Sequence, residues 1–423
     1  TSVVLKLLPR IQKLFSILSV VPVPHPLAPT TASCGEAFIP LNHTLHGLQD
    51  TDLLIYLTSS MYCRSQGDKN QIFPSVCHFD QHMRPIVGTL ALCLNDDSDA
   101  IFNDLIFYLG QIVGWSPSLF SHYRNPDTGI PWGTSTKEVT CHDKSTQLVE
   151  LPNILKSAND GSGFQLISPT VVQVARNQFD CQTMTGVPFA GDVGCFGNWF
   201  DERLFYHEGL FTPLTLALLE DSGWYKIDYQ RAVPALFGRG AGCGFVKGGC
   251  IAEEGDMPLY AKGFFGRGVG CDYKHSSKAD VDEPAGDGED MLCPLRSRTL
   301  VSCADESQSP TLPGETFGDD SRCYETNTGE PICLNTFCSQ GKVHFQIEDE
   351  IKKCDFDGMT IQLNGYQLEC PRAAVLCARE ICPANCSGRG ICDYCREIPE
   401  CVCDDPFDVS EGCWGEASGA QQA

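Results

Sequence analysis

The sequence has few basic residues and no long apolar run, and both shortages exclude large classes of protein. Lysine and arginine number 30 against 54 aspartates and glutamates, which gives a formal net charge of −24. A surface this acidic repels phosphate backbones, so we expect no nucleic-acid partner. No apolar run reaches the roughly eighteen residues that a membrane-spanning helix needs, so we expect no transmembrane segment in this chain. The sequence also lacks a Gly-Lys-Ser/Thr phosphate loop and a Gly-x-Ser-x-Gly nucleophile elbow.

Cysteine, in contrast, is abundant. The 25 cysteines are scattered along the chain, and only Cys392 and Cys395 form a Cys-x-x-Cys pair. Metal ligands would occur in tight pairs, so the scatter indicates a disulfide framework made in the secretory pathway. The odd count leaves one thiol free, in a bridge to another molecule, or paired outside the chain. We expect an extracellular or cell-surface product from which a leader has been removed. The sequence does not decide whether the protein also carried a signal for a lipid anchor.

Two sequons support the secretory route, although so short a motif also arises by chance. Asn42-His43-Thr44 and Asn385-Cys386-Ser387 match the acceptor pattern for N-linked glycans. We therefore expect glycans on Asn42 and on Asn385.

Hydrophobic periodicity predicts an α/β unit at the start of the chain. Residues 3–18 place apolar side chains at helical spacing around Pro9, which predicts an amphipathic helix. The apolar runs at 50–59 and 84–94 predict strands, and residues 101–114 predict a buried helix. We expect the apolar face of 3–18 to belong to the core rather than to a membrane surface.

The remainder of the chain changes in character near residue 240. Residues 168–181 and 212–225 predict two further helices, the second closing near Gly223. Beyond residue 240 the helical periodicity fades and cysteines recur about every ten residues, which predicts a disulfide-stapled domain of strands and loops. The acidic stretch 278–290 lacks EF-hand spacing, so we interpret it as a solvated loop in preference to a calcium site.

The last cysteines follow a recognisable order. With Cys395 left out, six cysteines resemble the order of an EGF-like module: Cys382, Cys386, Cys392, Cys401, Cys403 and Cys413. We expect Cys395 to pair upstream, with Cys377 as the candidate.

Several segments along most of the chain can be compared, in order, with a known family. The segments are LPRIQKLFSILSVVPVPHPL, CGEAFIPLNHTLHGLQDTDLLIYLTS, RPIVGTLALC, GWSPSLFSHYRNPDTG, SPTVVQVARNQFDC, LTLALLEDSGWYKIDYQRA, GAGCGFVKGGC, SRCYE and the cysteine-rich tail. Each segment alone is weak evidence, but in this order they resemble the leishmanolysin-like surface metallopeptidases. The resemblance implies a zincin fold of the metzincin type.

The resemblance implies a zinc site and an overall α+β architecture. In the family a helix carries His-Glu-x-x-His-x-x-Gly, a later loop supplies a third histidine, and a methionine turn lies beneath the metal. Three imidazoles hold the zinc, and the glutamate acts as general base on its water. We expect four parts: a zincin-like N-terminal domain over 1–118, a mixed central domain over 119–240, a cysteine-rich domain over 241–381, and the EGF-like module over 382–414.

The positions that should carry this chemistry hold other residues. We align the family pattern with this sequence on Gly-Trp-Ser at 114–116. Phe107 then occupies the position of the first histidine, Tyr108 that of the glutamate and Gln111 that of the second histidine. Asn198 stands at the third histidine and Leu210 at the methionine. No His-Glu-x-x-His occurs anywhere in the 423 residues. The sequence therefore predicts a pseudopeptidase with no catalytic residue, no metal and no cofactor.

Other histidines offer weaker candidates for a metal. His78, Asp80 and His82 lie close together in the sequence, and His207 is followed by a glutamate. We interpret the first group as a polar loop, and His207 lacks a second histidine four residues later.

Three functions follow from this sequence. The first is an inactive leishmanolysin-like protein that binds other extracellular or surface proteins, or copies of itself, in a structural or adhesive role such as a filament or coat. The alternative is an active zinc endopeptidase with an unconventional metal site. The third is a receptor that uses the same scaffold to bind carbohydrate or protein.

Overall fold

The structure is a computed structural model, and it divides into two compact units. One unit comprises residues 1–172 and 185–233, and the other comprises 173–184 and 234–423. Helices, sheets and many disulfides together confirm a mixed α+β protein, whereas the four-part division stays a prediction. The residues described are 2–20, 26–61, 63, 71–94, 100–140, 146–157, 164–189, 211–248, 257–281, 295–348, 350–363 and 365–415.

The first unit contains a three-stranded sheet in the order β4 (Leu54–Ser59), β6 (Pro85–Cys93) and β5 (Gln71–Phe79). Strand β4 runs parallel to β6, and β5 runs antiparallel to it. The central strand β6 is buried along most of its length. Both strands predicted from apolar runs are thus confirmed. Strand β5 was missed because Pro74 interrupts it, which an edge strand tolerates.

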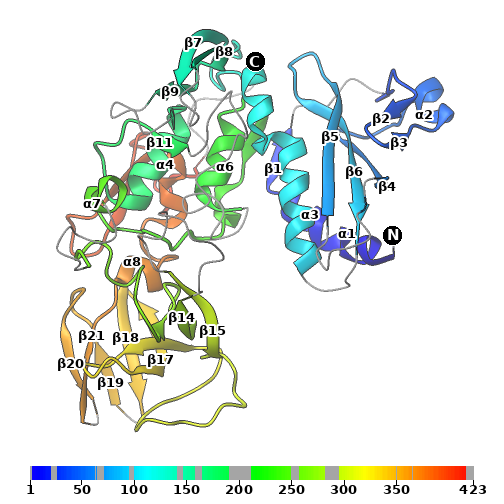
Figure 1. Ribbon diagram of the computed structural model, residues 1–423. Helices are drawn as coiled ribbons and strands as arrows, with labels where there is room; N and C mark the ends of the chain where they lie inside the picture. The colour runs from blue at the N-terminus through cyan, green and yellow to red at the C-terminus, as the bar shows by residue number, and fades with distance from the viewer. Residues whose placement is uncertain are drawn as a thin grey trace. The chain divides into compact units, whose positions relative to one another are not determined.

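Helices cover one face of this sheet. α1 (Ser2–Phe15), which contains Pro9 as expected, and α3 (Ala100–Gly110) lie along that face (Figure 1). Arg10 of α1 stacks over the ring of Phe102 of α3, 4.2 Å from its centroid. The other face carries β2 (Ser33–Cys34), β3 (Ala37–Phe38) and α2 (Leu41–His46). The disulfides Cys34–Cys77 and Cys63–Cys93 fasten this region.

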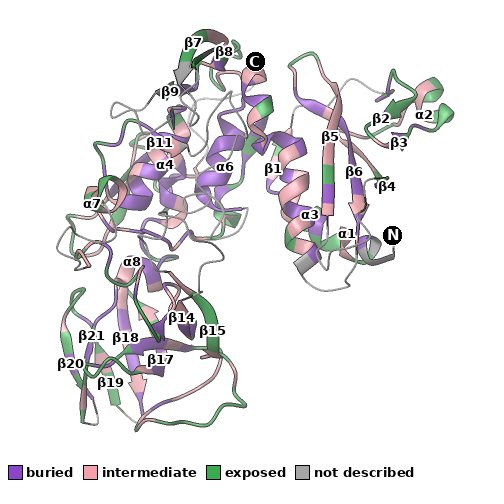
Figure 2. Cartoon of the chain, in the orientation of Figure 1, coloured by how far each residue is buried: buried purple, intermediate pink, exposed green. Residues whose placement is uncertain are grey.

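The rest of the first unit surrounds α6 (Pro213–Glu220). Thr212 caps this helix by accepting a hydrogen bond from the backbone N–H of Thr215, and every side chain of α6 is buried (Figure 2). The helix ends before Gly223, as the sequence predicted. The remaining strands and short helices are β1 (Leu18–Val20) paired with β12 (Tyr225–Ile227), β7 (Thr134–Thr140) with β8 (Thr146–Pro152), the sheet of β9 (Leu155–Ser157), β10 (Phe164–Leu166) and β11 (Val187–Phe189), and the 3₁₀ turns η2 (Pro117–His122) and η3 (Tyr229–Arg231).

Helix α4 (Pro169–Phe179) matches the helix predicted over 168–181, and its residues belong partly to each unit. No helix among the described residues is long and apolar enough to cross a membrane.

The second unit consists mainly of antiparallel strands, as the sequence predicted. Its core lies under the four-stranded sheet and includes Leu334, Val343 and Phe345. The sheets are β13 (Gly270–Cys271), β14 (Ser277–Val281) and β15 (Arg296–Ser302); β16 (Ser321–Glu325), β17 (Pro331–Ser339), β18 (Lys342–Ile347) and β19 (Glu350–Lys353); β20 (Thr360–Leu363) and β21 (Tyr366–Glu369); and β22 (Gly390–Asp393) and β23 (Glu400–Cys403). The short helices are α7 (Cys243–Lys247), α8 (Ala373–Leu376) and η4 (Pro383–Gly388).

The acidic stretch differs in part from the expected loop. Residues 278–281 belong to β14, where Asp280 forms an ion pair with Arg298 of the neighbouring β15, and Ala279 is fully buried. The expectation of a loop was therefore wrong for these residues, because the strand buries alternate side chains. Residues 282–290 lie outside the described part of the chain.

The disulfides correct one predicted pairing. Cys377 bonds to Cys338 of β17, while Cys395 is a free and exposed cysteine in the described part of the chain. Cys377 is buried in the core cluster of this unit, and its sulfur is already used in the bond to Cys338, so it is not available to Cys395. With Cys395 left out, the six cysteines after residue 381 pair first with third, second with fourth and fifth with sixth, as Cys382–Cys392, Cys386–Cys401 and Cys403–Cys413.

Candidate functional site

The helix predicted over 101–114 is confirmed, and it ends in an unusual way. α3 continues at Gly110 into a single wide turn, the π-helix η1 (Gln111–Trp115). Two glycines make this turn sterically possible. A Cβ atom on Gly110 would lie 1.7 Å from Cε3 of Trp115, and one on Gly88 of β6 would lie 2.9 Å from Cγ2 of Ile112.

Side chains from distant parts of the unit hold η1 in place. The phenol of Tyr225 donates to the carbonyl oxygen of Val113 at 2.8 Å, and that of Tyr123 donates to Gly114 at 2.7 Å. Both bonds satisfy carbonyls that the end of a helix leaves without an intrahelical partner. Burial raises the pKa of Tyr225 far above its ordinary value, so its phenol stays protonated and can donate. Trp115 Nε1 donates to the carbonyl of Thr215 in α6 at 3.0 Å.

The three residues that replace the expected zinc-binding pattern lie on one side of α3. Leu105 and Leu109 turn towards α1, and at 100° per residue Phe107 falls on the opposite face. Gln111, one turn later, opens η1 on that same side. Phe107, Tyr108 and Gln111 are all half-buried.

The chemistry of this face is aromatic. The rings of Phe107 and Tyr108 meet edge to face, with centroids 5.2 Å apart. Burial raises the pKa of Tyr108, and the nearby carboxylate of Asp104 raises it further. A phenyl ring has no lone pair to offer a metal, and a neutral phenol and an amide oxygen are poor zinc ligands beside imidazole. The side chains present here do not fit a zinc ion.

The other two positions of the expected pattern, Asn198 and Leu210, lie outside the described part of the chain. The same is true of His207, one of the weaker candidates for a metal. Their assignments therefore stay predictions.

The alternative histidine group is used for packing and hydrogen bonding. His78 is on strand β5 rather than in a loop, and it bonds to the hydroxyl of Thr31 at 3.0 Å. Burial lowers the pKa of His78. Asp80 forms an ion pair with Arg84 at 3.1 Å and accepts the backbone N–H of His82 at 2.8 Å. The ligand atoms of His78, Asp80 and His82 do not converge on one point.

Among the described residues, one group of three potential ligands does converge. It consists of the sulfur atoms of Cys382, Cys386 and Cys401. All three are in disulfides, so none offers a thiolate to a metal.

Comparisons with known proteins agree with the family resemblance seen in the sequence. The protein-family profile for peptidase M8, described as leishmanolysin, matches residues 138–267. These matches support a member of the leishmanolysin-like family. The ciliated left-right organizer metallopeptidase of Danio rerio is 24% identical over 386 residues, which cover 81% of this chain and 58% of that protein. A leishmanolysin-like peptidase of Caenorhabditis elegans is 24% identical over 269 residues, 52% of this chain and 40% of the relative. A leishmanolysin homolog of Crithidia fasciculata is 25% identical over 242 residues, 54% of this chain and 33% of the relative.

This leishmanolysin-like chain spans about half the length of the relatives it matches. The matched profile begins at residue 138, after η1 has ended. The profile match therefore covers the segment from β7 to α7, and the alignment of α3 depends on the Gly-Trp-Ser anchor.

The two sequons of the leishmanolysin-like chain differ in accessibility. Asn42 is exposed on α2, where the hydroxyl of Thr44 donates to the carbonyl of Leu41 at 2.9 Å. Asn385 is only 1% exposed, and its Nδ2, the atom that would carry the sugar, donates to Gln178 at 2.8 Å. The folded chain is therefore compatible with a glycan at Asn42, and its geometry argues against one at Asn385.

Asn385 also belongs to a buried polar network that the sequence analysis missed. Its side-chain oxygen accepts a hydrogen bond from the buried guanidinium of Arg239. Arg239 donates in addition to the carbonyl of Cys382 at 3.0 Å. The sequence did contain one signal that Asn385 is buried. Cys386 is the middle residue of the sequon, and a disulfide at that position anchors the segment inside the module.

Proposed function

We propose that this leishmanolysin-like chain has no hydrolytic activity and works outside the cell by binding or assembly. The observation that carries the proposal is the face of α3 and η1 where Phe107, Tyr108 and Gln111 stand. These side chains cannot supply two imidazole ligands and a carboxylate base. A structural or binding role for this face of α3 and η1 fits these side chains better than hydrolysis does.

The aromatic pair supports a filled site rather than an open one. Phe107 and Tyr108 are half-buried and pack edge to face. Aromatic rings contribute apolar contact where a metal would otherwise join the helix to its surroundings. On this proposal the turn η1 keeps its position through Trp115, Tyr123 and Tyr225, without a metal.

The disulfides support an extracellular location. The described residues contain ten of them, and each typically stabilises a protein by about 2–4 kcal/mol. Such bridges form and persist in oxidising compartments. We propose that the metzincin-type fold applies to the first unit, and that residues 382–414 form an EGF-like module with the pairing described above.

Exposed apolar side chains support a binding role. Phe38 on β3 is 89% exposed, and Leu41 and Leu45, one turn apart on α2, are 71% and 66% exposed. Large apolar residues gathered on a surface mark sites of association. We propose that this edge of the first unit contacts a protein partner or a second copy.

Peptidase assays test the first half of the proposal. The purified protein, supplied with zinc, is incubated with unfolded casein and with a mixed peptide library. We expect no cleavage above that of a blank, with or without a chelator. Cleavage that a chelator abolishes and added zinc restores would overturn the proposal.

Light scattering tests the second half. We expect the wild-type protein to self-associate or to bind a surface protein, and the variant carrying Leu41→Ser and Leu45→Ser to lose this. Leu148→Ser, on an equally exposed leucine of β8, is the matched control and should leave association unchanged. A wild-type protein that stays monomeric and binds no partner would contradict an assembly role.

A further inference from the structure

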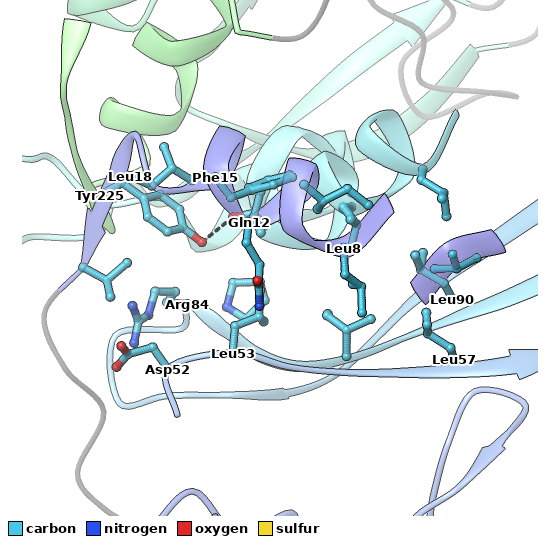
Figure 3. Close-up of a pocket in the computed structure, with 18 residues that line it drawn as sticks. Leu8, Gln12, Phe15, Leu18, Asp52, Leu53, Leu57, Arg84, Leu90 and Tyr225 are labelled. Carbon is cyan, nitrogen blue, oxygen red and sulfur yellow. Dashed lines mark hydrogen bonds between the residues drawn. The ribbon is translucent and has the colours of Figure 1, made fainter. Parts of the chain in front are cut away.

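A cavity of about 500 Å³ lies between α1, α3 and the inner face of the sheet (Figure 3). Its volume falls within the range of small-molecule sites, about 300–1,000 Å³. The side chains that line most of it are aliphatic. They include Leu8 and Ile11 from α1, Ile55 and Leu57 from β4, and Leu105 and Leu109 from α3. The inner surface therefore suits an apolar chain.

One end of the cavity is polar. Figure 3 shows Arg84 and Asp52 at this end and Leu57 and Leu90 at the other. Arg84 is only 4% exposed, and its Nε donates to Asp80 at 3.1 Å. Its Nη2 atom is buried and has no hydrogen-bond partner among the described residues. A buried donor without an acceptor is unfavourable, and more so when it is charged, so this atom marks a place for an acceptor.

The surrounding charges select the kind of acceptor. Asp80 already neutralises Arg84, and Asp52 brings a second carboxylate to the same end. An anionic head group would add a negative charge beside a guanidinium that Asp80 already neutralises, which is unfavourable in a partly buried site. A neutral carbonyl oxygen can accept the hydrogen bond from Nη2 without this cost.

We propose that the cavity binds the acyl chain of a neutral lipid, with Arg84 Nη2 donating to its carbonyl oxygen. The chain lies along Leu8, Leu57 and Leu109, and the carbonyl lies at the end formed by Arg84. The site is independent of the proposed loss of hydrolysis, because Leu105 and Leu109 face the cavity while Phe107 lies on the opposite side of α3.

The test measures binding of oleamide, a neutral long-chain amide, to the whole protein by native mass spectrometry and by displacement of a fluorescent lipid. We expect one oleamide per chain. Octadecene, which lacks an acceptor, and oleate at neutral pH, which carries a charge, should each bind at least about tenfold more weakly.

A cavity-filling variant separates this site from unspecific adsorption. Leu8→Phe extends into the cavity and should weaken oleamide binding at least about tenfold, without lowering the midpoint of thermal unfolding. Leu148→Phe, on the exposed face of β8, should leave binding unchanged. Absence of one-to-one binding by the wild type, or equal binding by Leu8→Phe, would overturn the proposal. Tighter binding of oleate than of oleamide would overturn the choice of a neutral head group.

Discussion

Gly110 and Trp115 are in such close contact that a Cβ atom on the glycine would lie 1.7 Å from Cε3 of the indole. The ring of Trp115 is buried, and its nitrogen bonds to the carbonyl of Thr215. This contact fixes where α3 ends and η1 begins. The helix therefore keeps its shape through packing.

Gly110→Ala should destabilise the protein. The added methyl group displaces the indole or the backbone of η1, and overpacking of this kind costs about 1–3 kcal/mol. The free energy of unfolding in urea measures the effect. Asn103→Ala, on the exposed side of α3, is the control and should change stability by less than about 0.5 kcal/mol. Equal stability of Gly110→Ala and wild type would contradict the close contact.

The buried carboxyl of Asp221 should give the protein a specific pH dependence. It accepts the backbone N–H groups of Thr170 at 3.2 Å and Val171 at 2.9 Å, at the start of α4. Burial raises its pKa above the ordinary value, although the hydrogen bonds act in the opposite direction. The folded state therefore holds the proton more tightly than the unfolded state does.

The sign of that dependence follows from linkage. The contribution of Asp221 is fully present below its unfolded pKa of about 3.9 and is lost as the pH rises through the higher folded pKa. Asp221→Asn does not titrate, so its unfolding free energy should fall less steeply over this range. Urea unfolding at successive pH values, compared between the two proteins, measures the difference. Identical slopes would show that the pKa is not raised.

Much of the fold was predictable from local patterns. Helices α1, α4 and α6 and strands β4 and β6 follow from apolar spacing, because each buries one continuous stripe or run. Strand β5 was not predictable in this way. Pro74 interrupts it and most of its residues are half-buried, so the sequence shows no clear apolar pattern there. The pairing of Cys377 with Cys338 depends on the sheet of the second unit, which spacing alone does not reveal.

The candidate site was predictable only in part. The Gly-Trp-Ser anchor placed Phe107, Tyr108 and Gln111 on one helix, and the structure confirms that helix. The π-turn and its hydrogen bonds were not predictable, because Tyr225 is 112 residues away from Val113 in the sequence. The cavity beside Arg84 was also missed, since the apolar stripe of α1 was assigned wholly to the core.

Glycan occupancy should differ between the two sequons. Asn42→Gln should remove the mass of one glycan from the secreted protein, because Asn42 is exposed. Asn385→Gln should leave the glycan mass unchanged and lower stability by about 1–3 kcal/mol, since it disrupts a buried bond to the charged Arg239. Intact-mass measurement before and after glycosidase treatment decides this. Loss of a glycan in Asn385→Gln would contradict the buried position of that side chain.

Among the cysteines that the structure describes, Cys395 should be the one that reacts as a thiol in the native protein. It is exposed and free, whereas its neighbours Cys392 and Cys401 are in disulfides. Alkylation without reductant, followed by peptide mapping, should label Cys395, and Cys395→Ser should abolish the label with little change in stability. If wild-type Cys395 is instead found bonded to a second molecule, it supplies a covalent link for assembly. Labelling of Cys377 or Cys338 would contradict the disulfide described here.

The zinc content of the protein, measured by elemental analysis after purification without chelators, tests the central claim most directly. We expect far less than one zinc per chain, because Phe107, Tyr108 and Gln111 do not form a ligand set. As a control, the variant with Phe107→His, Tyr108→Glu, Gln111→His and Asn198→His should take up more zinc than the wild type. One tightly bound zinc per wild-type chain would contradict the proposed loss of the zinc site and would favour an active zinc peptidase.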